Sequence, residues 1–277
     1  MNAPHSIVLR DIQLKGGDLF FLIAGPCVIE GQDHALHMAQ AIQAITQRLD
    51  IPLIFKSSFD KANRTSVHSY RGPGLEKGLV ALRRVKEETG LPVLTDVHEV
   101  WQVAPVAEVC DAIQIPAFLS RQTDLLLAAG RSGAVVNIKK GQFVSPQEVC
   151  HAVEKVRSTG NDRILITERG SSFGYNNLVV DMRSLPLLRS FGYPVVLDVT
   201  HSVQLPGGAG QASGGQPQFI EPLARAGVAV GVDGLFLEVH DNPAAALSDG
   251  ASALPLAQLE SLLERLLALD RLVRPWL

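Results

Sequence analysis

Short apolar runs rich in β-branched residues alternate along the whole chain with longer segments in which apolar residues recur near i, i+3, i+4 and i+7. The short runs predict buried strands, and the longer segments predict amphipathic helices. Eight strands are predicted in this way, at residues 19–24, 53–56, 93–96, 112–115, 134–139, 164–167, 195–198 and 234–238. Helices are predicted between and after them, among them residues 33–49, 75–89, 146–158, 219–226 and 256–273.

Repeated strand–helix units are typical of α/β proteins with a parallel sheet. Eight of them in a chain of 277 residues predict one (β/α)8 TIM-barrel domain over residues 1–277, because such barrels take ~250 residues. A doubly wound open sheet is the alternative, but it would place a Gly-x-Gly-x-x-Gly fingerprint where this chain has Gly25-Pro26-Cys27. Within the N-terminal extension, 1–18, we expect a small hairpin over residues 7–17, with a turn at Gly16-Gly17, that plugs the N-terminal mouth of the barrel.

Composition narrows the classes of function. The chain is 46% hydrophobic and 19% charged, which excludes a disordered or low-complexity protein. A net charge of -3 gives no general field for polyanions, so no nucleic-acid partner is expected. The most apolar stretch, 19–29, is shorter than the ~20 residues of a membrane span, so no membrane association is expected. Three cysteines, an odd number, indicate a reducing cytoplasm rather than a disulfide framework.

Polar residues gather where the predicted strands end. In a (β/α)8 barrel the active site is built at the C-terminal ends of the strands and in the loops that follow them. One isolated charge in such a place is often only a solvated loop residue, but polar residues at the ends of all eight strands predict an active site. The residues are Cys27, Lys56, Asp96, Gln114, Lys139, Glu168 with Arg169, Asp198 with His201, and Glu238 with Asp249 further on.

Five cations are predicted to converge at this mouth of the barrel: Lys56, Lys61, Arg64, Lys139 and Arg169. They repel one another unless anionic groups neutralise them, and lysine and arginine suit phosphate groups. Local pairing with Asp60, Asp96 and Glu168 would satisfy some of the five but hardly all. The sequence therefore predicts a phosphorylated ligand with more than one phosphate group.

A second subset, Cys27, His201, Glu238 and Asp249, offers sulfur, nitrogen and oxygen donors of the kind that bind Zn, Fe, Mn or Co. Their spacing matches no short metal motif, and a lone cysteine after a strand is usually a small buried hydrophobe. In a closed barrel, however, the first, seventh and eighth strands are neighbours, so the four side chains can meet at one divalent metal.

Two other features suggest simpler interpretations. His34 and His37 lie three residues apart on the first predicted helix and are interpreted as part of its solvated face. The glycine-rich run 206–215 lacks the Gly-Lys-Ser/Thr ending of a P-loop and is interpreted as a mobile lid.

From about residue 21 to residue 255, the chain resembles the 3-deoxy-D-manno-octulosonate 8-phosphate synthases. The segments that carry the resemblance are AGPC (24–27), FKSSFDKANRTS (55–66), TDVH (95–98), QIPA (114–117), NIKKGQ (137–142) and LDVTHS (197–202). The second segment is the most specific, because the related 3-deoxy-heptulosonate 7-phosphate synthases carry a Lys-Pro-Arg-Thr pattern there.

The resemblance implies a transferase that condenses phosphoenolpyruvate with arabinose 5-phosphate and water, giving the eight-carbon sugar acid phosphate of lipopolysaccharide precursor synthesis and inorganic phosphate. It implies that phosphoenolpyruvate is held by Lys56, Lys61, Lys139 and Arg169, with Gln114 beside it. It implies that the pentose phosphate is held by Asn63, Arg64, Thr65 and Asp96, with Arg121 reaching in from a neighbouring subunit of a homotetramer. Thr65 stands where the family usually has serine, a change that keeps the hydroxyl.

The resemblance also implies which residues act in the reaction. Catalytic roles fall to Lys61, Asn63, His201 and Asp249. Cys27, His201, Glu238 and Asp249 match the branch that uses one divalent metal per subunit, whereas metal-free members have asparagine in place of the cysteine.

Two competing functions remain open at this point. A Schiff-base aldolase would use Lys56 or Lys139 as its nucleophile, with a lowered pKa and no metal. A non-catalytic sugar-phosphate sensor would need neither the metal ligands nor two anion sites.

Overall fold

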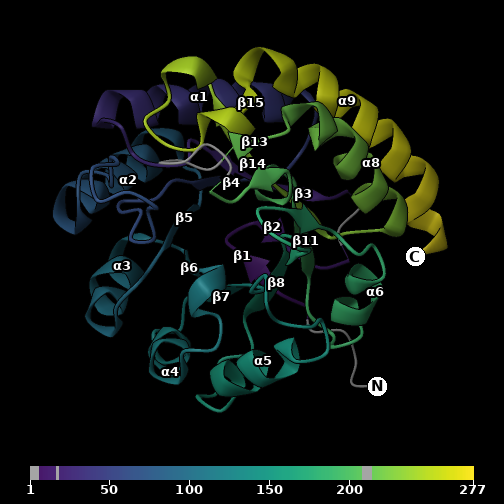
Figure 1. Ribbon diagram of the computed structural model, residues 1–277, viewed down its shortest axis with the longest axis horizontal. Coiled ribbons are helices and arrows are strands. Elements are labelled where there is room, and N and C mark those ends of the chain that lie inside the picture. The colour runs from purple at the N-terminus through teal and green to yellow at the C-terminus, as the bar shows by residue number, and fades with distance from the viewer. Residues whose placement is uncertain (1–5, 17–18, 208–213) are drawn as a thin grey trace.

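The computed structural model describes residues 6–16, 19–207 and 214–277. Its parallel strands close into a barrel surrounded by helices (Figure 1), so the predicted (β/α)8 fold is confirmed and the doubly wound alternative is wrong. In spatial order the strands are β3 (Phe21–Gly25), β4 (Leu53–Lys56), β5 (Val93–Asp96), β6 (Ala112–Ile115), β7 (Val135–Lys139), β8 (Ile164–Glu168), β11 (Val195–Asp198) and β14 (Gly234–His240). β14 pairs in parallel with both β11 and β3, which closes the ring.

The hydrophobic pattern predicts these strands well because each is buried on both of its faces, by the barrel interior and by the helix layer. That layer consists of α1 (Gln32–Arg48), α2 (Leu75–Thr89), α3 (Val103–Val109), α4 (Thr123–Arg131), α5 (Val149–Arg157), α6 (Ser184–Arg189), α8 (Ile220–Val230) and α9 (Leu256–Val273). Leu259, Leu263 and Leu266 show the spacing that places one apolar stripe of α9 against the barrel. The helix predicted at 146–158 starts only at Val149, after a turn.

Short elements complete the chain between and beyond these units. The strands are β9 (Ser171–Ser172), β10 (Leu178–Val179), β12 (Gln204–Leu205), β13 (Gly214–Gly215) and β15 (Leu254–Pro255). The helical turns are α7 (Val199–Ser202), η1 (Val100–Gln102), η2 (Ala117–Leu119), η3 (Pro217–Phe219), η4 (Pro243–Ala245), η5 (Gly250–Ser252) and η6 (Arg274–Trp276). Among the described residues, no helix is both long and apolar enough to cross a membrane.

The N-terminal hairpin consists of β1 (Val8–Leu9) and β2 (Ile12–Gln13) and lies across the middle of the ring of strands in Figure 1. Its apolar side chains, Ile7, Leu9, Ile12 and Leu14, are buried in the main core. Arg10 donates to the Asp111 carboxylate at 3.1 Å and to the Gly90 carbonyl at 2.6 Å, both of which precede strands. The hairpin therefore covers the N-terminal mouth, as predicted.

The turn of this hairpin is not where the sequence placed it. The chain reverses at Arg10-Asp11, where Arg10 has a φ of 55°, and not at Gly16-Gly17. Gly17 lies outside the described residues, as do residues 1–5 and 18. Of the predicted lid at 206–215, residues 208–213 also lie outside them, and β12 and β13 flank this gap as an antiparallel pair.

Candidate active site

A cavity of about 390 Å³ opens at the C-terminal mouth of the barrel. It brings together eleven of the residues singled out in the sequence: Lys56, Lys61, Asn63, Arg64, Thr65, Asp96, Gln114, Lys139, Arg169, His201 and Asp249. Cys27 and Glu238 lie behind the wall of this cavity, next to Asp249. The C-terminal ends of the strands therefore meet at one site, as the fold requires.

Strands β4 and β7 place two lysines deep in the cavity, since Lys56 and Lys139 are their last residues. Lys56 is 1% exposed and donates to Ser58 Oγ at 2.8 Å and to the Cys27 carbonyl at 3.3 Å. Strand β3 approaches β4 so closely that a Cβ on Gly25 would lie 2.0 Å from the Lys56 carbonyl oxygen. Glycine at this position allows the loop with Cys27 to reach the lysine.

The loop after β4 supplies the remaining candidate residues for the sugar. Lys61 is buried, whereas Asn63 and Thr65 are exposed at the cavity and free of regular structure. Arg64 is half-buried and reaches across to Asp249 at 3.4 Å, with a second hydrogen bond to Ser248. This arginine therefore ties the loop to the segment that follows β14.

The cations are only partly neutralised by the protein. Lys139 forms an ion pair with Asp198. Lys56 and Lys61 share one carboxylate, with each Nζ 3.9 Å from Glu238 Oε1. Arg169 donates to the Gln204 amide at 3.0 Å, and its Nη1 is buried without a partner among the described residues. The Arg169 guanidinium in particular is left for an anionic ligand.

Burial and neighbouring charges shift several pKa values in the cavity. Burial lowers the pKa of Lys61, but the neighbouring acidic groups, Cys27 and Glu238 above all, outweigh it and raise that pKa above its ordinary value. Burial lowers the pKa of Lys139 and of Arg169, although Asp198 opposes the shift in both. The site thus combines one firmly protonated lysine with one lysine that gives up its proton more readily.

The carboxyl groups in the cavity show the opposite trend. Burial alone would raise the pKa of Asp249, but Lys61 and His201 lower that pKa to about 2. Lys56 and His98 likewise hold the pKa of Asp96 well below its usual range against the effect of burial. Both carboxylates are therefore ionised at neutral pH.

The predicted metal ligands largely come together. Ligand atoms of Cys27, Glu238 and Asp249 lie within 4.8 Å of one another. Cys27 Sγ is 3.0 Å from Ser248 Oγ and 3.2 Å from Asp249 Oδ2. His201 approaches this group through Glu238, with Nε2 3.4 Å from Oε1, while its Nδ1 lies 2.7 Å from the Asp198 carboxylate.

The Glu238 carboxylate shows that these residues fit a cation. Its side chain is 1% exposed, yet neither oxygen has a hydrogen-bond partner among the described residues. Burying a carboxylate without such partners is unfavourable unless a positive charge compensates it, and Lys56 and Lys61 supply that charge only from 3.9 Å, beyond hydrogen-bond distance. Burial raises the pKa of the Cys27 thiol, and the Asp249 and Glu238 charges raise it further, whereas a bound divalent metal favours the thiolate.

One predicted residue lies apart. Arg121 is exposed, directly before α4, and borders a separate cavity of about 180 Å³ rather than the main one. The nearby turn η2 lines the main cavity, and Phe118 on it is 54% exposed. The single chain therefore presents Arg121 to the outside, and the predicted role at a neighbouring subunit stays a prediction.

Some side chains that shape the site were not among the residues singled out in the sequence. Ser248 bridges Cys27 and Arg64, and Gln204 holds Arg169. His98 donates through Nε2 to the Asp96 carboxylate at 3.1 Å. Of these, only His98 carried a sequence signal, because it follows a strand-end aspartate by two residues.

Comparison with known proteins agrees with this geometry. Residues 6–274 match the model of the DAHP synthetase I family. Similar curated proteins include a "2-dehydro-3-deoxyphosphooctonate aldolase" of Trichlorobacter lovleyi, 59% identical over 96% of this chain and 98% of the relative. Two further relatives carry the same name. The one from Syntrophotalea carbinolica is 59% identical over 98% of each chain, and the one from a Cyanothece species is 60% identical over 95% of this chain and 96% of the relative.

Proposed function

The chain belongs to the DAHP synthetase I family, and we infer that it catalyses the reaction of its 2-dehydro-3-deoxyphosphooctonate aldolase relatives. In that reaction phosphoenolpyruvate, arabinose 5-phosphate and water give 3-deoxy-D-manno-octulosonate 8-phosphate and inorganic phosphate, a step in lipopolysaccharide precursor synthesis. The observation that carries the inference is the set of five cations in the cavity, where Lys56 and Lys61 lie 3.9 Å from the Glu238 carboxylate and Arg169 forms no ion pair with any described residue. Two phosphorylated substrates would supply the missing negative charge.

The chemistry requires one carbon–carbon bond to form and one carbon–oxygen bond to break. C3 of phosphoenolpyruvate attacks the sugar aldehyde, water adds at C2, and the tetrahedral intermediate expels phosphate. The attacking water gives up both of its protons. One goes to the new sugar hydroxyl and the other leaves with phosphate as the C2 ketone forms, so no net proton is taken from the protein. Lys56 and Lys61 would stabilise the phosphate charge that develops, in a position where both are nearly excluded from solvent.

We propose that Cys27, His201, Glu238 and Asp249 hold one divalent metal. When bound, such a metal supplies Lewis acidity toward the aldehyde oxygen or the attacking water. Asp198 would orient His201 through Nδ1, at 2.7 Å, and so leave Nε2 facing Glu238. The unpartnered carboxylate of Glu238 supports this assignment, and Zn, Fe, Mn and Co all remain compatible with the donor set.

We also propose that Asn63 and the adjacent Arg64 and Thr65 select the five-carbon acceptor, because all three line the cavity where the sugar hydroxyls would lie. The test is phosphate release from phosphoenolpyruvate with arabinose 5-phosphate or erythrose 4-phosphate, each with and without chelator. A site that bonds a hydroxyl can reject an analogue lacking it by ~10⁴-fold, so we expect a large preference for the pentose. Equal or faster turnover with the four-carbon sugar would refute this specificity.

A homotetramer in the cytoplasm is our proposal for the physiological state. Exposed Phe118 at the cavity and exposed Arg121 three residues further along the chain support a neighbouring subunit there, and three unpaired cysteines support a reducing compartment. Mixing inactive Arg121→Ala chains with inactive Lys139→Ala chains should restore part of the activity, because some mixed sites regain both residues. Verified mixed oligomers without any recovery would argue against a shared site.

A further inference from the structure

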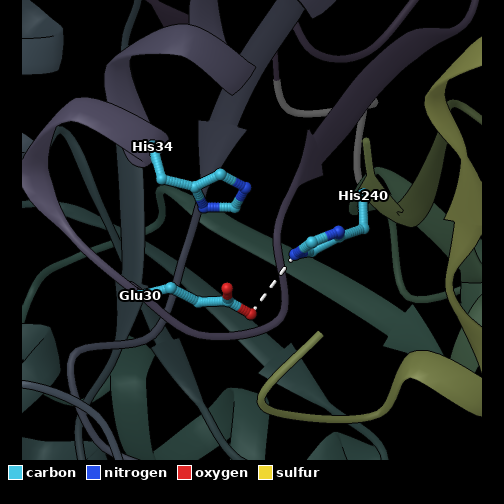
Figure 2. A group of neighbouring side chains, drawn as sticks. All are labelled: Glu30, His34 and His240. Carbon is cyan, nitrogen blue, oxygen red and sulfur yellow. Dashed lines mark hydrogen bonds and ion pairs between the residues drawn. The ribbon is translucent and has the colours of Figure 1, made fainter. Parts of the chain in front are cut away.

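A second group of ligand-type side chains lies outside the cavity, and Figure 2 shows Glu30, His34 and His240 pointing toward one another. Glu30 lies in the loop after β3, His34 in the first turn of α1, and His240 at the end of β14. One ligand atom from each lies within 4.8 Å of the other two. The interpretation of His34 as a solvated residue is therefore wrong, since its side chain is only 22% exposed, whereas His37 is exposed.

Asp241 holds both histidines from behind. Its Oδ1 lies 3.1 Å from His34 Nε2 and 3.0 Å from His240 Nδ1. The other nitrogen of each ring is then turned toward the group: His240 Nε2 is 3.2 Å from Glu30 Oε1, and His34 Nδ1 is buried without a partner among the described residues. A carboxylate bonded to the outer nitrogen is the arrangement that orients metal-binding histidines.

The proton positions allow both histidines to act as ligands. A neutral imidazole carries one proton, so a ring that donates to Asp241 keeps a lone pair on its other nitrogen. The amide of Asn242 lies 2.9 Å from His240 Nδ1 but also 3.0 Å from Asp241 Oδ1. When that amide donates to Asp241, His240 Nδ1 can hold its own proton, and Nε2 becomes free to bind.

We propose that Glu30, His34 and His240 form a second site for a divalent transition metal such as Zn²⁺, separate from the one in the cavity. Two imidazole nitrogens and one carboxylate, with a water in the fourth position, are a ligand set that zinc accepts. Zinc bonds of about 2.0–2.1 Å place tetrahedral ligands roughly 3.4 Å apart. The Glu30–His240 pair already has nearly this spacing at 3.2 Å, and the ligand atoms of all three residues lie within 4.8 Å of one another.

The position of this site suggests a structural role rather than a catalytic one. Glu30 comes three residues after Cys27, and His240 comes two residues after Glu238. Glu30 Oε1 also accepts from the amide of Leu247, two residues before Asp249. A metal here would fix the segments that carry three of the proposed ligands in the cavity.

The test is to strip the full-length protein with chelator, reload it with Zn²⁺ and count the tightly bound metal per chain. His34→Gln removes Nδ1 but keeps an amide that can reach Asp241, and Glu30→Gln keeps an oxygen for the Leu247 amide. Each is expected to bind one zinc fewer than the wild type, with affinity at this site weaker by at least ~10²-fold. The control, His37→Gln, changes an exposed histidine on the same helix and should keep the wild-type count.

Co²⁺ separates the two sites, because only a metal at Cys27 gives a thiolate-to-cobalt absorption band. The proposal expects His34→Gln to keep this band while losing one cobalt per chain. Equal metal counts in the wild type, His34→Gln and Glu30→Gln would overturn it and would show a purely hydrogen-bonded cluster. A count that falls by only one cobalt per chain while the thiolate band is lost would also overturn it, because the histidine would then act on the cavity metal.

Discussion

Replacing Cys27 with alanine distinguishes a metal ligand from a packing residue, because the two roles predict losses of very different size. The side chain is 4% exposed, and its thiol donates to Asp249 at 3.2 Å. Removing the sulfur forfeits burial of about one heavy atom, about 0.8 kcal/mol, and one hydrogen bond, about 1 kcal/mol. Asp249 keeps Arg64 as a partner, so no buried charge is left alone.

A loss of about 2 kcal/mol leaves at least about 3 kcal/mol of a typical 5–15 kcal/mol unfolding free energy. At 1.4 kcal/mol per tenfold change, fewer than ~1% of chains would then be unfolded at 25 °C. Changes in residues that merely support metal ligands weaken metal binding by ~10–100-fold, so losing a ligand itself should exceed that range. A fall in activity of more than ~100-fold therefore cannot come from unfolding.

The assay compares bound metal per chain, phosphate release and melting temperature in metal-buffered solution. Cys110→Ala is the matched control, since this cysteine is 3% exposed but ends helix α3, outside the cavity. We expect both variants to melt a few degrees lower, and only Cys27→Ala to lose the cavity metal and its activity. Stoichiometric metal and near-wild-type turnover in Cys27→Ala would refute the reasoning.

Cys27→Asn extends the same test. An asparagine amide can donate to the nearby carboxylates and so replace part of the charge compensation that a metal would give. If the resemblance to metal-free members holds, this variant should retain activity that chelators no longer abolish. Activity that stays fully chelator-sensitive would contradict that expectation.

Three further predictions concern charge and packing. Nearby cations hold the pKa of Asp96 low, so the charge of this carboxylate stabilises the fold above about pH 4. In urea unfolding, the difference in stability between the wild type and Asp96→Asn should therefore shrink as the pH falls below that value, and a constant difference would contradict this. A Cβ on Gly78 would lie 2.3 Å from Phe59 Cβ. Gly78→Ala should therefore lower the free energy of unfolding by about 1–3 kcal/mol in the same assay, although alanine has the higher helix propensity. Unchanged stability would show that α2 shifts freely. Burial lowers the pKa of Lys139, as a Schiff-base lysine requires, but its ion pair with Asp198 favours the charged ammonium form. Borohydride with both substrates should therefore leave no covalent adduct in the intact mass, whereas a trapped adduct would favour a Schiff-base aldolase.

The sequence predicted what depends on local pattern and on the closure of the barrel. All eight strands were found because a strand buried on both faces is a nearly continuous apolar run. The hairpin turn was misplaced because glycine pairs usually mark turns, whereas here tertiary bonds from Arg10 to Asp111 and Gly90 support its positive φ. His34 was misjudged for a similar reason, since the carboxylate that holds it lies 207 residues further along the chain.

The approach of Asp249 to Cys27, 222 residues away, follows from the length of one strand. β14 extends beyond the other strands, and its last two residues pair in parallel with β15, at Val239 with Leu254 and at His240 with Pro255. The intervening segment is thus held at both ends, and Asp249 adopts a left-handed conformation there, with a φ of 50°. Two carboxylates and a thiol are held together in this frame although the two carboxylate charges repel, which is the condition under which a cation bound among them stabilises the fold as well as the reaction.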